Sequence, residues 1–93
     1  MEEVMQKIFK YEIPLTEKFK LDMPFAKSIL KVDVVDGKPY MWALTWDGNA
    51  PIEYEFELYP TGADIELDRV YAGTFRIADV VFHLFELYDD IPF

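Results

Sequence analysis

The chain has 93 residues, enough for one domain with its own core, and we expect a single domain over residues 1–93. Hydrophobic residues make up 52% of the chain, which excludes a disordered protein, and the absence of cysteine excludes disulfides and thiolate metal sites. The net charge of −9 disfavours direct binding to bare nucleic acid, because phosphates would be repelled.

The charge is unevenly distributed along the chain. Residues 1–38 hold seven lysines and seven acids, whereas residues 39–93 hold two arginines and eleven acids. We therefore expect a protein partner with a basic surface. No apolar run approaches the length of a membrane span, and the N-terminus lacks the basic region of a signal peptide, so we expect a cytoplasmic protein without membrane contact.

Apolar residues alternate in the first third of the chain, which is the period of half-buried strands. Residues 6–13 (QKIFKYEI) and 18–21 (KFKL) are predicted strands; Pro14 ends the first, and Met23-Pro24 stops the second. Residues 25–28 (FAKS) are predicted as a loop or a single helical turn. Next comes a strand in which Leu30, Val32 and Val34 share one face.

A β-hairpin is predicted at Asp36-Gly37, a pair that tolerates the positive φ angles of a two-residue turn. Its return strand has two apolar faces, one carrying Met41, Ala43 and Thr45 and the other carrying Tyr40, Trp42, Leu44 and Trp46. A strand with two apolar faces is typical of one covered on both sides. We interpret the aromatic residues as core; the alternatives are contact with a partner or second copy, or a ligand pocket lined by Tyr40, Trp42 and Trp46.

The acidic half continues with further predicted strands. The segment PIEYEFELYP (51–60) alternates, residues 63–68 are an acidic loop, and residues 70–77 form a strand with a candidate bulge at Gly73. Residues 78–88 are β-rich and predicted as a strand, a helix packed on a sheet being the alternative. Residues 89–93 are expected to be a loose tail. Taken together, these elements predict an all-β fold: a small antiparallel sandwich or partly closed barrel of six or seven short strands, with one helical turn at most.

Five motifs in fixed order resemble a family of small proteins of unknown function found largely in phages and prophages. They are IFKYE, VDGKPYMWAL, TGADI, YAGTF and VFHLFE, spread over nearly the whole chain. Phe25 stands where that family has Gly, which affects the local loop. The resemblance implies a phage or prophage accessory protein and carries over no catalytic or ligand residue.

Three glutamates, Glu53, Glu55 and Glu57, project from one face of the predicted strand 51–60. Their mutual repulsion predicts that they are solvated, either as a plain polar face or as an acidic surface that docks on a basic cleft. The second interpretation also needs Asp64, Glu66 and Asp68 nearby, with Tyr54 or Tyr59 as an anchor. Further carboxylates that could join such a surface are Asp47, Glu86, Asp89 and Asp90.

No pattern in the sequence predicts a catalytic or cofactor site. His83 is the only histidine and is expected to be structural. The acidic run 64–68 resembles the start of an EF-hand loop, but Arg69 and Phe75 stand where Gly and Glu are required. We expect a non-enzymatic protein that occludes the basic cleft of a host nucleic-acid or defence enzyme. The alternatives are a self-associating accessory protein and an oligomeric protein that sequesters a nucleotide.

Overall fold

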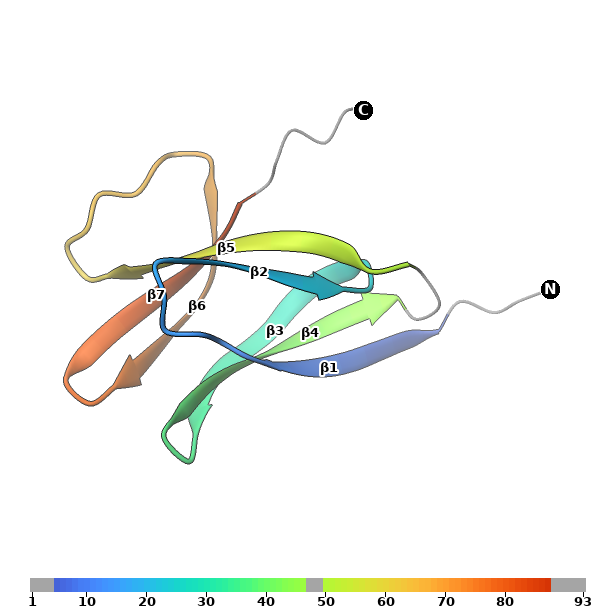
Figure 1. Ribbon diagram of the computed structural model, residues 1–93, viewed down its shortest axis with the longest axis horizontal. Coiled ribbons are helices and arrows are strands. Elements are labelled where there is room, and N and C mark those ends of the chain that lie inside the picture. The colour runs from blue at the N-terminus through green and yellow to red at the C-terminus, as the bar shows by residue number, and fades with distance from the viewer. Residues whose placement is uncertain (1–4, 47–49, 88–93) are drawn as a thin grey trace.

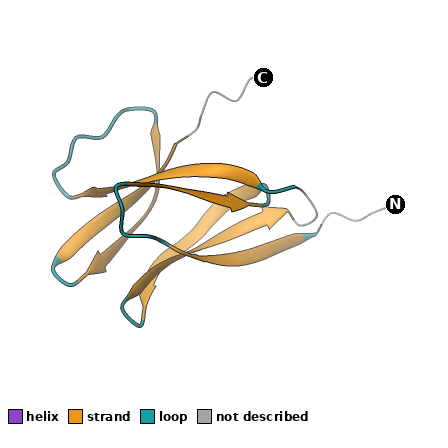
Figure 2. Ribbon diagram, viewed as in Figure 1, coloured by secondary structure: helices purple, strands orange, loops and turns teal. Residues whose placement is uncertain are grey.

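The computed structural model describes residues 5–46 and 50–87, with Ala26 and Lys27 described by their backbone alone. Over these residues the chain forms seven strands in an all-β architecture (Figures 1 and 2). They are β1 (Gln6–Glu12), β2 (Lys18–Met23), β3 (Ala26–Val35), β4 (Lys38–Trp46), β5 (Ile52–Pro60), β6 (Arg69–Ile77) and β7 (Val80–Leu87). The expected tail at 89–93 lies outside the described residues. Within the described residues there is no helix long and apolar enough to cross a membrane.

The strands form two antiparallel sheets, ordered β1-β4-β3 and β2-β5-β7-β6. Their inner faces enclose a core to which both sheets and the β1–β2 connection contribute. The buried hydrophobic residues of the described chain are Ile13, Met23, Met41, Ala43, Phe56, Leu58, Phe75 and Leu84. The predicted all-β class and antiparallel sandwich are confirmed, and so is the strand assignment of the last apolar run, which is β7.

The β3–β4 hairpin turns at Asp36-Gly37 as the sequence predicts. Asp36 has a φ of 51° and Gly37 a φ of 79°, the left-handed values that a two-residue turn of this kind needs. Pro39 follows the turn near the start of β4, where its missing N–H costs least, although β4 is the central strand of its sheet.

The helical turn considered for residues 25–28 does not form. Residues 26–28 extend β3 instead, because Ala26 and Ser28 find partners on β4 opposite Thr45 and Leu44. The Phe25 carbonyl oxygen continues this pairing by accepting a hydrogen bond from the Trp46 N–H at 2.9 Å. Backbone groups that pair with a neighbouring strand have no need of a local turn to satisfy them.

A β-bulge in β3 changes which residues of that strand share a face. The register shifts between Ile29 and Lys31, so Leu30 is an extra residue without a direct partner on β4. Leu30 is exposed, whereas Val32 and Val34 pack against the core. The expectation that these three residues share one face is therefore wrong for Leu30, since a bulge displaces the alternation by one position.

The two sheets come closest where β3 meets β6. At this point Gly73 faces Val32, and a Cβ built on Gly73 would lie 2.7 Å from the Cβ of Val32. Glycine is required here because real Cβ atoms do not approach that closely. The register shift between Tyr71 and Gly73 places a bulge beside this contact, close to where the sequence predicts one.

Candidate functional site

The glutamate row lies on the outer face of the β2-β5-β7-β6 sheet, opposite lysines of β2. Glu55 pairs in register with Lys20, and Glu57 with Lys18. The Lys20 Nζ lies 3.5 Å from the Glu53 Oε1 and 3.4 Å from the Glu55 Oε1. The charge of Glu53, followed by the hydrogen bond to Glu55, raises the pKa of the Lys20 ammonium. The row is therefore matched by cations from the balanced half of the chain.

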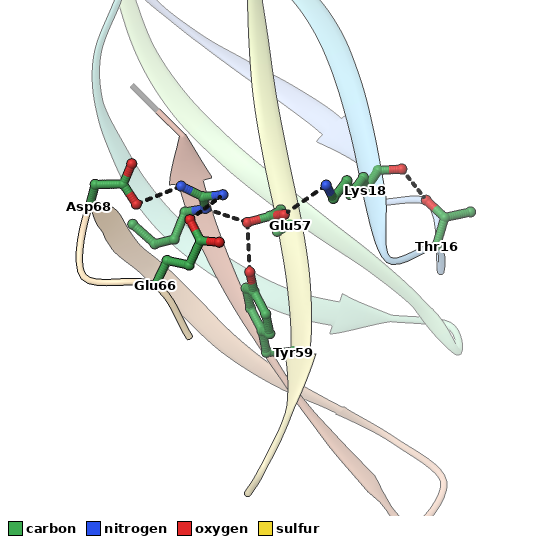
Figure 3. A network of polar contacts seen from close by, with 7 residues as sticks. Thr16, Lys18, Glu57, Tyr59, Glu66 and Asp68 are labelled. Atoms are coloured by element: carbon green, nitrogen blue, oxygen red, sulfur yellow. Dashed lines mark hydrogen bonds and ion pairs between the residues drawn. The ribbon is translucent and has the colours of Figure 1, made fainter. Parts of the chain in front are cut away.

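Glu57 is buried, which contradicts the expectation that all three glutamates are solvated. Its side chain is 5% exposed and that of Arg69 is 13% exposed, and the Arg69 Nε donates to the Glu57 Oε1 at 2.5 Å. The Tyr59 hydroxyl donates to the same oxygen at 2.6 Å, and the Lys18 Nζ lies 3.6 Å from the other. Figure 3 shows these groups converging on the carboxylate. A carboxylate can be buried when donors and cations replace its water.

The surroundings of Glu57 keep it ionised. Burial alone would raise the pKa of the carboxyl, but the hydrogen bonds from Tyr59 and Arg69 and the positive charges of Arg69 and Lys18 outweigh it. The pKa of Glu57 is therefore lowered. Conversely, the hydrogen bond to Glu57 raises the pKa of the Tyr59 phenol.

Arg69 also binds two carboxylates of the β5–β6 loop, which spans residues 61–68 and contains the predicted acidic segment 63–68; we call this whole loop the acidic loop. Its Nη2 lies 3.3 Å from the Glu66 Oε2, and its Nη1 donates to the Asp68 Oδ1 at 2.6 Å. Asp64 is exposed, and Leu67 is fully exposed, at 104%. Asp47, Asp89 and Asp90 lie outside the described residues. Arg69 thus links Glu66 and Asp68 to Glu57. From the sequence, Arg69 stands out only as the residue that breaks the EF-hand pattern.

His83 lies on the same outer face and is held through both ring nitrogens. Its Nε2 is 2.9 Å from the Thr61 Oγ1, and its Nδ1 is 3.0 Å from the Thr74 Oγ1. The Thr74 hydroxyl also lies 2.6 Å from the Tyr71 hydroxyl. These contacts give His83 a structural position linking β7 to β6 and to the start of the acidic loop.

The aromatic residues of β4 are on the outside of the β1-β4-β3 sheet and not in the core. Met41, Ala43 and Thr45 are buried inside, and the Thr45 hydroxyl donates to the Lys7 carbonyl at 2.9 Å. Tyr40, Trp42 and Leu44 are half-buried on the opposite face, and Trp46 is 38% exposed. The interpretation of these aromatic residues as core is therefore wrong, because alternation along an apolar strand does not say which face turns inward.

Charged residues of β1 and β3 flank this aromatic stripe in two neighbouring rows. In one row Trp42 lies between Lys10 and Lys31, whose Nζ atoms are 5.6 and 5.7 Å from the ring centroid. In the next row Tyr40 lies between Glu12 and Asp33. We call the outer surface of β1, β4 and β3 the aromatic face.

Contacts within the aromatic face hold these charges in place. The Lys31 Nζ is 3.2 Å from the Asp33 Oδ2, and the Lys38 Nζ is 3.7 Å from the Glu12 Oε1. The Lys10 Nζ lies 4.1 Å from the Tyr40 ring centroid. The backbone N–H of Val34 and the charge of Lys31 lower the pKa of the Asp33 carboxyl. Sequence reasoning missed Lys10 and Lys31, because only the strand register places them beside Trp42.

The net charge also differs between the two sheets. The strands β1, β4 and β3 carry five lysines against Glu12 and Asp33, a net charge of +3. The strands of the other sheet carry four cations against five acids, a net charge of −1. Most of the negative charge is therefore in loops and termini, and the aromatic face belongs to the most basic part of an acidic chain.

The described surface of the other sheet is hollowed in places. One hollow, of about 250 Å³, is lined mainly by β2 and β5 around Phe19 and Phe56, and one of about 420 Å³ lies between Glu17 and Asp64 beside Tyr59. Tyr40, Trp42 and Trp46 line neither of them. Tyr54 lies on the core side of β5 and packs against the core, so of the two proposed tyrosine anchors only Tyr59 is on the outer face.

In the described part of the chain, seven antiparallel strands in two facing sheets define a small all-β sandwich protein. A family model described as "Domain of unknown function (DUF7352)" matches residues 5–92. The chain therefore belongs to this family. No curated protein and no solved structure matches this chain significantly.

Proposed function

We propose that this protein acts without catalysis, as a self-associating accessory protein of a phage or prophage whose contact surface is the aromatic face. The observation that carries the proposal is the stripe Tyr40, Trp42, Leu44 and Trp46, which lies partly exposed along the middle strand of a sheet whose other side already forms the core. Large aromatic residues at the centre of a surface, with polar residues around them, are typical of protein interfaces.

Burial of this stripe against protein would be favourable. Each aromatic side chain removed from water contributes about 25 cal/mol for every Å² of apolar surface that is covered. Flanking charges would form the polar rim. The phage or prophage setting is inferred from the five motifs described above.

The test is the oligomeric state measured by sedimentation velocity over a wide range of protein concentration. The mass should rise from monomer to dimer as concentration increases, and Trp42→Ala should shift the transition to at least tenfold higher concentration. Tyr71→Ala is the matched control, since Tyr71 is an exposed aromatic residue on the outer face of the other sheet. A wild-type protein that stays monomeric at millimolar concentration would rule out the proposal.

A second candidate function is the docking of the acidic loop on a basic cleft of a host nucleic-acid or defence enzyme. It is favoured by Leu67, a fully exposed apolar side chain between Glu66 and Asp68. Carboxylates beside an apolar anchor could occlude a cleft that normally holds phosphates. Glu53, Glu55 and Glu57 contribute less to this surface than expected, because Lys18, Lys20 and Arg69 face them.

Inhibition of DNA cleavage by a panel of purified restriction and CRISPR-type nucleases tests this candidate. Wild type should inhibit one of them at low salt and less at high salt, because the ion pairs are screened. Leu67→Ser and Asp64→Lys should both relieve inhibition, whereas Asp79→Lys, an exposed acid in the β6–β7 turn, should not. Equal inhibition by wild type and both loop variants would reject the acidic loop as the contact.

A further inference from the structure

The two charged rows of the aromatic face have opposite signs and lie side by side. The lysine row consists of Lys10 and Lys31 around Trp42, and the acidic row of Glu12 and Asp33 around Tyr40. Each row crosses the same three strands, which lie beside one another in Figure 1. All four charged side chains are exposed. A surface with this pattern is complementary to itself, provided that a second copy is turned so that its acidic row faces the lysine row of the first copy, and its lysine row the acidic row.

When the strands of the two copies are aligned, only one twofold arrangement brings rows of opposite charge together. A twofold axis that crosses the strands between the rows places β1 on β1 and the lysine row on the acidic row. An axis along the strands keeps each row opposite itself, so Lys10 of one copy would face Lys31 of the other and be repelled. Twofold dimers bury the same patch on both copies, which requires such self-complementarity.

We propose that the aromatic face binds a second copy of this chain about a twofold axis between the two rows, pairing Lys10 with Glu12 and Lys31 with Asp33 of the other copy. In this arrangement Trp42 of each copy packs on Tyr40 of the other. The inference rests on the proposed self-association and adds its geometry. Four intermolecular ion pairs then surround two aromatic contacts.

Charge also favours this occupant over an anionic ligand. Phosphates attracted to Lys10 and Lys31 would lie one row away from Glu12 and Asp33, about 7 Å along the strands, and would be repelled by them. The face measures roughly 20 by 15 Å, judged from three strands about 4.8 Å apart and four residue rows. That is small for a permanent interface, so the dimer is reversible.

The sharpest test exchanges the two rows without changing the total charge. The variant Lys10→Glu/Glu12→Lys/Lys31→Asp/Asp33→Lys should self-associate about as well as wild type, because its rows are still complementary. It should not form mixed dimers with wild type, because every cross-pair then has like charges. Native mass spectrometry of the mixture, with one protein isotopically labelled, measures the mixed species. Mixed dimers at the statistical proportion would overturn the inference.

Reversal of a single row supplies the control. Lys10→Glu/Lys31→Glu alone, and Glu12→Lys/Asp33→Lys alone, should each weaken self-association at least tenfold, and an equimolar mixture of the two should restore it. All substituted side chains are exposed, and thermal unfolding checks that each variant folds. If wild type dimerises and Trp42→Ala dissociates it but row reversal has no effect, the twofold geometry is wrong and the proposed function stands. If wild type never dimerises, both fail.

Discussion

The Glu57 carboxylate and the Arg69 guanidinium are joined across β7, a strand to which neither residue belongs. Glu57 lies beside Phe85 and Arg69 beside Leu87, so the ion pair crosses β7 between these two positions. β5 and β6 are both hydrogen-bonded to β7 and not to each other. The pair is therefore a direct link between them, and through Glu66 and Asp68 it also fixes the acidic loop.

The first prediction concerns the contribution of this link to stability. Glu57→Gln should lower the free energy of unfolding by about 1–2 kcal/mol, because a nearly buried Arg69 and the Tyr59 hydroxyl lose their charged acceptor. Glu55→Gln is the matched control; it loses only a more exposed pair with Lys20 and should change stability much less than Glu57→Gln does. Urea denaturation measures both. Equal losses for the two variants would mean that the buried ion pairs of Glu57 stabilise the fold no more than the exposed pair of Glu55 does.

The second prediction is a pH dependence with a definite sign. The pKa of Glu57 is lower in the folded protein than in the unfolded chain, so the unfolded state binds the proton more readily. Stability from Glu57 is therefore fully present above the unfolded value of about 4.3 and is lost as pH falls through the folded pKa. The difference in unfolding free energy between wild type and Glu57→Gln should shrink as pH is lowered from about 7 to about 3. A difference that stays constant over this range would contradict the assignment.

The third prediction tests the close approach of β3 and β6. Gly73→Ala should destabilise the fold by about 1–3 kcal/mol, because the new Cβ would overlap the Val32 side chain. Val32→Ala in the same chain should recover part of this loss, since it removes the methyl groups in the way. A double-mutant cycle followed by thermal unfolding measures the coupling. Additive effects would show that the strain lies in the backbone and not in the contact with Val32.

The fourth prediction distinguishes the two faces of β4. Met41→Ala should cost about 2–5 kcal/mol because it leaves a cavity in the core. Trp42→Ala should cost clearly less, although tryptophan is the larger side chain, because Trp42 lies on the outer face. Both should be measured in dilute solution, where self-association adds no stability by mass action. A larger loss for Trp42→Ala than for Met41→Ala would place the aromatic residue in the core after all.

Much of the fold was predictable from local patterns. Alternation identified the strands, and Asp36-Gly37 identified the hairpin, because both depend on the geometry of a few neighbouring residues. The prediction failed at residues 25–28, where pairing with β4 decides the conformation, and at Leu30, which a bulge turns outward. The burial of Glu57 was also missed, since its principal partner, Arg69, is twelve residues away and on a non-adjacent strand.

The amino-acid sequence by itself determined that this chain is a β protein, where its strands run, and that its acids concentrate in the second half. These properties follow from residue type and from a period of two, which a regular stretch of strand obeys wherever it lies in the fold. Only the tertiary structure decided which face of β4 turns inward, which cations meet the glutamates, and that Lys10 and Lys31 flank Trp42. Those relationships depend on strand register and sheet order, which are set by the packing of the whole chain and not by any local stretch of it.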